Sequence, residues 1–303
     1  MPLSRYIAFL LVGALVGVWL LTAAPAAADA EQSQTSEDKD KAEPVKAAAI
    51  DPSDFNVGGA GDLLIAPTRV VLEGRTRAAE ITLHNKGAKE ATYRVSFAHV
   101  TMDDNGRYTE LKDQAAQNKA LRFADELLRY SPHQVTLKPG ESQVVKVMVR
   151  PSEGLAEGEY CSHLLFRAVP DASAGEDVEA TKVQDGKITI HLVPIYGVSI
   201  PVIVRHGTLS AQARVSNVRL SGRNLLLTLT RSGTASVYGD VIATEAGSDT
   251  VVGQLRGVAV LATNDRRNVS MPLTAQAHGT LTVEYRQRVE DGGKVLDKTS
   301  IAL

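Results

Sequence analysis

The sequence predicts an all-β protein made of two immunoglobulin-like β-sandwich domains, set at an angle with a cleft between them. From residue 62 onward, short runs of alternating apolar and polar residues recur, with turn signals about every ten residues. Strong helical segments between these runs, which a parallel α/β fold would need, are absent. Only Arg205-His206-Gly207 joins the two groups of strands. So short a linker fixes the angle between the sandwiches and leaves a cleft.

The first 60 residues are expected to lie outside both sandwiches. Residues 1–30 have the features of a cleavable secretory signal peptide: the basic Arg5, the apolar run Ile7–Leu21 and the small residues of Ala28-Asp29-Ala30. An uncleaved membrane anchor is the alternative, although the apolar run is short for a membrane span. Residues 31–60 are charged and alanine-rich, which predicts a disordered tail. The mature chain is therefore expected outside the cytoplasm.

Residues 61–206 are expected to form the first, N-terminal sandwich. Asn85-Lys86-Gly87 and Asp103–Gly106 have the composition of tight turns, the second of a hairpin. Loosely periodic apolar residues over 110–129 predict one short helix. The expected strands are Leu63–Leu72, Ala79–His84, Thr92–His99, Val135–Leu137, Gln143–Val149, Tyr160–Val169 and a long final strand.

Residues 207–303 repeat this texture and are expected to form a smaller C-terminal sandwich. Its expected strands are Ala213–Leu220, Asn224–Arg231, Ser236–Ala243, Gly257–Leu261, Arg267–Leu273, Gly279–Gln287 and Lys294–Leu303.

The long final strand of the first sandwich, Lys187–His206, is the most informative stretch. Apolar residues occupy its even positions from Ile188 to Val204, which predicts one apolar face. Pro194 and Pro201 cannot donate to a ladder, so the strand should lie at a sheet edge or change neighbours partway. This strand lacks the charged residues that usually prevent an edge strand from pairing with another chain. Its apolar edge must therefore be covered by the chain itself or by a partner. An ordinary strand that crosses from one domain to the next is the alternative.

Composition and motifs disfavour several classes of function. A net charge of −2, with one Trp and five Phe, argues against a nucleic-acid-binding surface. The seven histidines show no zinc-ligand spacing, and neither a nucleophile elbow nor a phosphate loop occurs. We therefore expect no enzymatic activity, no metal, no cofactor and no small-molecule substrate.

Cys161 is the single cysteine, so the chain can form no internal disulfide. In a secreted protein it could be a reactive thiol, and His163 on the same strand face would allow a dyad. The alternative is a small buried apolar residue.

Several segments, taken in order, resemble the periplasmic pilus (fimbrial) chaperones, the PapD-like family. The opening strand Ala66–Leu72, the second strand and turn Ile81–Asn85, and the stretch Tyr130–Gln143 with its Leu-Lys-Pro-Gly are similar to the family's. Glu159–Pro170 is similar to its sixth strand. The resemblance covers residues 62 to about 207 well and the second domain in texture, closest to the archaic and spore-coat-type branches.

The resemblance implies a periplasmic chaperone without enzymatic activity. Its partners would be pilin-like subunits, which it binds by donor-strand complementation and hands to an outer-membrane usher. The exposed strand could also cap itself in a homodimer. The alternative function is a two-domain periplasmic adaptor that reuses the scaffold for another surface assembly. The resemblance assigns subunit binding to Ile188, Ile190, Leu192, Tyr196, Val198 and Ile200.

The resemblance also implies two charged sites. Arg69, preceded by Thr68, matches the arginine that anchors the subunit's terminal carboxylate, although a solvated strand arginine is the alternative. The family's second anchor, a lysine, falls on Pro201, which puts two-cation anchoring in doubt. Glu159 and Arg205 match two members of an interdomain charge cluster. Asp291 is a looser match for the third, and an ordinary surface position is its alternative.

Overall fold

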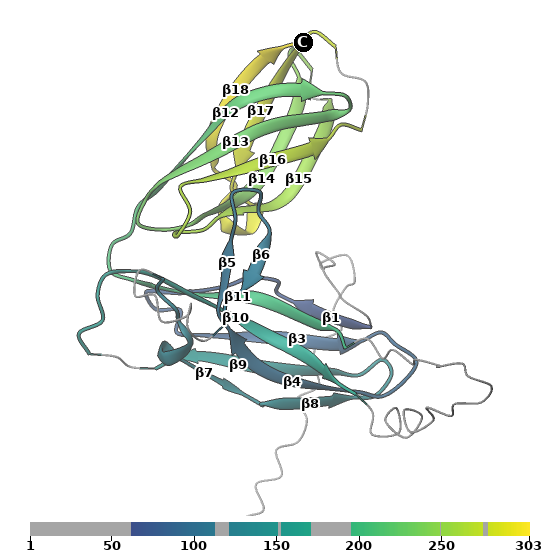
Figure 1. The fold of residues 1–303 in the computed structure, drawn as a ribbon, viewed down its shortest axis with the longest axis vertical. Helices are drawn as coiled ribbons and strands as arrows, with labels where there is room; N and C mark the ends of the chain where they lie inside the picture. Colours follow the sequence, from purple (N-terminus) through teal and green to yellow (C-terminus); the bar gives the residue numbers. More distant parts are fainter. Residues whose placement is uncertain (1–61, 113–120, 151–152, 171–194, 249, 275–277) are drawn as a thin grey trace, which may run out of the picture. The chain divides into compact units, whose positions relative to one another are not determined.

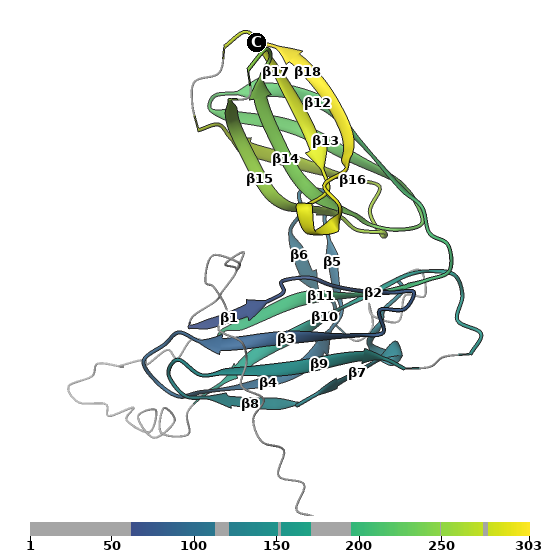
Figure 2. The ribbon, with the colours of Figure 1, turned by 180° about the vertical axis from the view of Figure 1, so that it is seen from behind.

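The computed structural model describes residues 62–112, 121–150, 153–170, 195–248, 250–274 and 278–303. These residues belong to one compact unit and fold almost entirely into β-strands (Figures 1 and 2). The all-β class with two immunoglobulin-like sandwiches is confirmed. The signal peptide and the tail lie outside the described residues. The domain limits at 61, 206 and 207 stay predictions. In the described part of the chain, no helix is long and apolar enough to cross a membrane.

The first sandwich consists of a four-stranded and a five-stranded sheet that enclose one apolar core. Apolar side chains at alternate strand positions point between the sheets, as a period of two requires. The first sheet has the order β1 (Leu63–Ala66), β3 (Ala78–Asn85), β9 (Ser142–Val149), β7 (Leu128–Ser131). The second has the order β2 (Val70–Glu73), β11 (Gly197–His206), β10 (Gly158–Val169), β4 (Ala91–Ala98), β8 (Gln134–Leu137).

The opening segment forms two strands in different sheets, where the sequence predicted one strand. β1 pairs antiparallel with β3, whereas β2 pairs in parallel with β11. Pro67 lies between them, and its missing N–H interrupts any ladder that would continue from β1. The crossing leaves Thr68 and Arg69 between the two strands.

The predicted helix over 110–129 is wrong for its described part. Only a short 3₁₀ turn, Asp125–Leu127, precedes β7, which pairs with β9. Leu128 and Ala124 are buried in the core of the sandwich. Of the apolar residues that looked loosely helical, Leu128 begins this edge strand and Ala124 directly precedes the 3₁₀ turn. Residues 113–120 lie outside the described chain.

The predicted hairpin turn forms, between β5 (Val100–Met102) and β6 (Tyr108–Glu110). The Asp103 carboxylate accepts hydrogen bonds from the backbone N–H groups of Asn105 and Arg107 at 2.9 and 2.8 Å. This hairpin also contacts the second sandwich. There Arg266 Nε donates to Asp104 Oδ2 at 2.8 Å, and Asn264 Nδ2 donates to the carbonyl of Met102 at 2.8 Å.

The second sandwich packs a three-stranded sheet against a four-stranded sheet around its own core. The strand predicted over Gly257–Leu261 begins earlier, at Val251, and bulges where it pairs with β14. A second 3₁₀ turn, Val289–Asp291, precedes the last strand. The three-stranded sheet has the order β12 (Ala211–Ser221), β13 (Asn224–Gly233), β16 (Arg266–Pro272). The four-stranded sheet has the order β15 (Val251–Val260), β14 (Val237–Glu245), β17 (Thr280–Arg286), β18 (Val295–Ala302).

Asn85 stabilises the turn after β3 from a fully buried position. Its Nδ2 donates to the carbonyls of Lys89 and Leu137 at 2.8 and 3.0 Å, and its Oδ1 accepts the N–H of Gly87 at 2.9 Å. Asn85→Ala should therefore lower the free energy of unfolding by about 2–3 kcal/mol, because a buried carbonyl loses its donor. Urea denaturation measures this, with the exposed neighbour Lys86→Ala as the control. Equal midpoints for the two variants would show that the turn does not depend on this amide.

Candidate functional site

One face of the β10–β11 ladder carries the predicted polar site residues. The two strands pair antiparallel, so Glu159 lies opposite Arg205 and His163 lies opposite Pro201. The alternate residues, such as Leu164 and Val202, fill the core of the first sandwich. The polar face is thus the outer face of the sheet, on the side where residues of the second sandwich make contact.

Glu159 and Arg205 form an ion pair on this outer face. Arg205 Nε donates to Glu159 Oε2 at 2.9 Å, and the Glu159 side chain is only 2% exposed. Burial would lower the pKa of Arg205, but the charge of Glu159 and its hydrogen bond outweigh burial and raise it. Arg205 therefore remains a cation at physiological pH.

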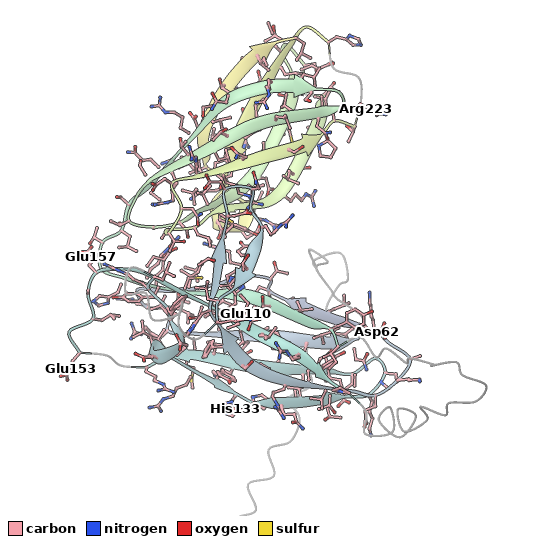
Figure 3. All side chains as sticks on the ribbon, in the orientation of Figure 1. Asp62, Glu110, His133, Glu153, Glu157 and Arg223 are labelled. Carbon is pink, nitrogen blue, oxygen red and sulfur yellow. The ribbon has the colours of Figure 1, made fainter. Side chains whose placement is uncertain are left out.

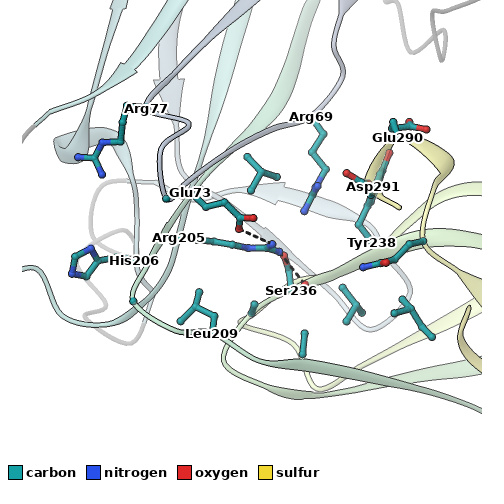
Figure 4. A pocket seen from close by; sticks show the side chains of 18 residues that line it. Arg69, Glu73, Arg77, Arg205, His206, Leu209, Ser236, Tyr238, Glu290 and Asp291 are labelled. Atoms are coloured by element: carbon teal, nitrogen blue, oxygen red, sulfur yellow. Dashed lines mark hydrogen bonds and ion pairs between the residues drawn. The ribbon is translucent and has the colours of Figure 1, made fainter. Parts of the chain in front are cut away.

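The pair also holds one residue of the second sandwich by its backbone. Glu159 Oε2 accepts the Ser236 N–H at 3.0 Å. Arg205 Nη2 donates to the Ser236 carbonyl at 3.3 Å (Figure 4). The N–H and the C=O of Ser236 thus both form hydrogen bonds, as they would with a neighbouring strand in a sheet.

The third charged member of this cluster is Glu73, which replaces the predicted Asp291. Glu73 Oε2 accepts from Arg205 Nη1 at 3.2 Å, since β2 lies beside β11 in register. Asp291 makes no hydrogen bond or ion pair with Arg205 among the described residues. It lies in the 3₁₀ turn before β18 and lines the cavity into which Arg69 points (Figure 4).

Arg69 directly precedes β2 and reaches toward the second sandwich. Its guanidinium carbon is 4.6 Å from the centre of the Tyr238 ring, a cation–π contact. No carboxylate of the described residues lies within ion-pair distance of it. Burial, followed by the positive charge of Arg205, lowers the pKa of Arg69, which means that an added anion would be stabilised there.

Two cavities meet at Arg69. The first, of about 900 Å³, is lined mostly by polar residues, including Glu73, Arg77 and Asp291. The second, of about 400 Å³, is mostly apolar and runs along β11. Arg69, Ser236 and Tyr238 line both cavities, so an anion beside Arg69 could extend an apolar group into the second. Thr68 lines only the apolar cavity.

β11 has a partly open edge, in agreement with the change of neighbours that its prolines predicted. β10 pairs with it from Gly197 to His206, but β2 pairs only with Val202–Arg205. On that side Gly197–Pro201 has no strand partner among the described residues. Pro201, which cannot donate, immediately precedes the paired part.

The described residues of the predicted subunit-binding set differ in exposure. Tyr196 is 52% exposed and Val198 is half-buried against the core, but Ile200 is only 2% exposed. The prediction for Ile200 is therefore corrected, because its side chain is packed inside its own sandwich. The remaining members, Ile188, Ile190 and Leu192, lie outside the described residues.

His163 lies on the same outer face, and the sequence suggested for it only a dyad with Cys161. It is 4% exposed, its Nδ1 lies 3.1 Å from Ser199 Oγ, and its ring packs 5.3 Å from that of Tyr108. Its Nε2 is buried and has no hydrogen-bond partner in the described chain. Burial lowers its pKa to about 4, so the ring is neutral at pH 7. The sequence signal available for this position was a polar residue on the same strand face as Glu159.

Cys161 has the environment of an inert thiol. Burial, reinforced by the negative charge of Glu159, raises its pKa to about 12. It lines a third cavity, of about 250 Å³, together with Arg122 and Glu157. Glu157 directly precedes β10 (Figure 3). Cys161 is half-buried, and its raised pKa disfavours the role of a nucleophile. No cluster of three potential metal ligands occurs in the described parts of the chain.

Comparisons with known proteins give matches of two kinds. A family model described as an Fn3-like domain matches residues 72–189. No curated protein matches the chain. Among solved structures, the chain is similar to the YadV chaperone at 12% identity and a TM-score of 0.42, over 80% of this chain and 100% of that one.

Two further solved structures show the same degree of similarity. The CupB2 chaperone of Pseudomonas aeruginosa has 13% identity and a TM-score of 0.42, over 79% of this chain and 99% of that one. The CsuC-CsuE chaperone–tip subunit pre-assembly complex from the archaic chaperone-usher Csu pili of Acinetobacter baumannii has 14% identity and a TM-score of 0.40, over 79% and 96%.

Proposed function

We propose that the protein is a non-enzymatic periplasmic chaperone that binds pilin-like subunits by donor-strand complementation and hands them to an outer-membrane usher. One observation supports this above the others. β11 has a strand edge without a partner over Gly197–Pro201, among the described residues, directly beside the cavity that contains Arg69.

An open edge offers backbone N–H and C=O groups that another chain can pair with. A subunit that lacks one strand of its own sandwich would gain both a ladder and a cover for its exposed core. The apolar residues Ile188, Ile190, Leu192 and Tyr196 precede and enter this edge in the sequence. Four buried side chains of this kind contribute about 6–12 kcal/mol before ordering costs.

Arg69 would anchor the terminal carboxylate of the subunit, with Thr68 beside it. A guanidinium pairs with a carboxylate through two parallel hydrogen bonds, and this one has no carboxylate partner in the described chain. Pro201 occupies the position where the resembled family has a second cation. Arg69 would therefore have to anchor the carboxylate with a different second group.

Ile190→Asp and Leu192→Asp should each abolish co-purification of a pilin-like subunit that is co-expressed in the periplasm, because a charge would have to be buried in the subunit's core groove. Mass spectrometry of the purified complex measures this, and a thermal melt verifies that the variant is folded. His191→Asp, which changes a polar position in the alternation of the same sequence run, is the matched control. Normal co-purification with both variants would exclude this stretch as the client site and leave an adaptor function.

A further inference from the structure

The hairpin of β5 and β6, Val100–Glu110, belongs to neither sandwich. Its two strands pair with each other and with no other strand of the described chain. All three residues of β6 are exposed, so the hairpin buries little of itself. A two-stranded ribbon of this kind is at best marginally stable in water. Its conformation must therefore be stabilised by the surfaces that it contacts.

The tip of the hairpin contacts the edge strand β16 of the second sandwich. Within the described chain, β16 pairs only with β13. On its other side, the N–H of Asn268 donates to the carbonyl of Asp104 at 2.6 Å, and Asn268 Nδ2 donates to Asn105 Oδ1 at 3.3 Å. Arg266 Nε donates to the carboxylate of Asp104 at 2.8 Å. The tip thus occupies the open edge of β16 and continues its hydrogen bonding by one backbone bond.

Two features show that the tip fits this edge closely. Asn264 Nδ2, from the loop before β16, donates to the carbonyl of Met102 at 2.8 Å, and Met102 itself is buried. Gly106 in the turn has a φ of +79°, and a Cβ added there would overlap with the guanidinium of Arg267. Glycine is therefore required at this position both by the backbone conformation and by the neighbouring strand.

The base of the hairpin is held by the first sandwich. The N–H of Leu111 donates to the carbonyl of His99, which directly follows β4, at 2.8 Å. The Tyr108 ring packs 5.3 Å from the ring of His163 in β10. β4 and β10 are neighbours in the five-stranded sheet. The hairpin therefore bridges the two sandwiches through residues other than those that hold Ser236.

We propose that this hairpin is a strap that fixes the angle between the two sandwiches in the free protein. The linker and the Ser236 contacts alone would leave one sandwich free to turn relative to the other about that region. A second attachment on β16 removes this rotation, because turning would pull the tip away from Asn264, Arg266 and Asn268. The strap goes beyond the proposed function, since it acts without a client, and it leaves the cleft between the sandwiches already formed when a client arrives.

The first test removes the hairpin from the mature protein. Asn-Gly replaces Val100–Glu110 as a two-residue turn, which can close because His99 and Leu111 already pair. Amide hydrogen exchange at Asn268 should become about tenfold faster or more, since its N–H loses its acceptor. The N–H of Val269, a residue in register with β13, should keep its exchange rate and is the internal control. Residual dipolar couplings of the two sandwiches should fit one common alignment tensor in the native protein and two different tensors in the variant.

The second test keeps the hairpin and disturbs only its docking. Gly106→Ala would place a Cβ against Arg267, so it should speed exchange at Asn268 and separate the two alignment tensors as the deletion does, to a smaller extent. Gly140→Ala is the matched control, because Gly140 also has a positive φ, of +74°, but has open space around its Cβ position. It should leave both measurements unchanged.

The strap is refuted if the sandwiches keep one common alignment tensor without the hairpin, or if they already need two tensors in the native protein. It is also refuted if Asn268 exchanges equally fast with and without the hairpin. If the deletion variant does not fold, Gly106→Ala decides, and equal results for Gly106→Ala and Gly140→Ala refute the docking of the tip. No outcome depends on client binding, so the proposed function stands or falls by the co-purification test alone.

Discussion

Replacing Arg205 by methionine should lower the free energy of unfolding by about 3–5 kcal/mol, because Glu159 would remain as a buried carboxylate without its cation. The Glu159 side chain is 2% exposed and its other contact is a single backbone N–H, that of Ser236. The loss should also weaken the contact with the second sandwich, since Arg205 donates to the Ser236 carbonyl. Chemical denaturation followed by circular dichroism measures the change.

A double-mutant cycle distinguishes the buried pair from a general effect of losing a charge. Glu159→Gln keeps an oxygen for the Ser236 N–H, so the double variant Glu159→Gln, Arg205→Met should be more stable than Arg205→Met alone. Lys146→Met, which breaks an exposed ion pair with Glu80, is the control and should cost at most about 1 kcal/mol. If Arg205→Met lowers the free energy of unfolding by less than Lys146→Met does, then water reaches Glu159. The charged cluster of Glu159, Arg205 and Glu73 would then not stabilise the contact with the second sandwich.

The fold could be predicted from the sequence because alternation and turn chemistry are local signals. The turn over Asp103–Gly106 and the apolar alternation of β13 depend only on neighbouring residues, and both appear as expected. The split at Pro67 was not predicted, because the exchange of one sheet for another is a tertiary event. Pro67 is evident in the sequence, but the new pairing after it depends on which strand edge is free, here that of β11.

The candidate site was predictable only in part, for a related reason. Alternation shows which residues share a strand face but not which face the core occupies, and so Ile200 was assigned to a client although it fills its own core. The pairing of Glu159 with Arg205 needed the register of β10 and β11, which the resemblance supplied. Glu73 was missed as the third charge, because its position depends on the parallel pairing of β2.

The burial of Arg231 was not predicted, although the sequence contained a signal for it. In β13 the odd positions Leu225, Leu227 and Leu229 are buried, and Arg231 continues this series with a side chain only 5% exposed. A charged residue at a core position of an alternating strand must have many partners. Here those partners are backbone carbonyls of two loops.

Arg231→Leu should therefore lower the free energy of unfolding of the protein by at least about 3 kcal/mol, since charge-assisted hydrogen bonds to several carbonyls are lost together. The guanidinium donates to the carbonyls of Asn264, Gly233, Ala262 and Ala235 at 2.9, 2.7, 3.0 and 3.2 Å. Leucine fills the apolar volume but cannot satisfy these acceptors. Arg266→Leu, which removes an exposed arginine of the same sheet, is the control and should change the free energy of unfolding far less.

The same substitution should also reach the interface, because two of these carbonyls belong to the segment that leads into Ser236. If Arg231 fixes the backbone that Glu159 and Arg205 hold, then Arg231→Leu and Arg205→Met act on one structural element. Their combined loss of stability should then fall short of the sum of the single losses by about 0.5–3 kcal/mol. Strict additivity in denaturation experiments would show instead that the loop keeps its conformation without the guanidinium, and that Arg231 stabilises only the second sandwich.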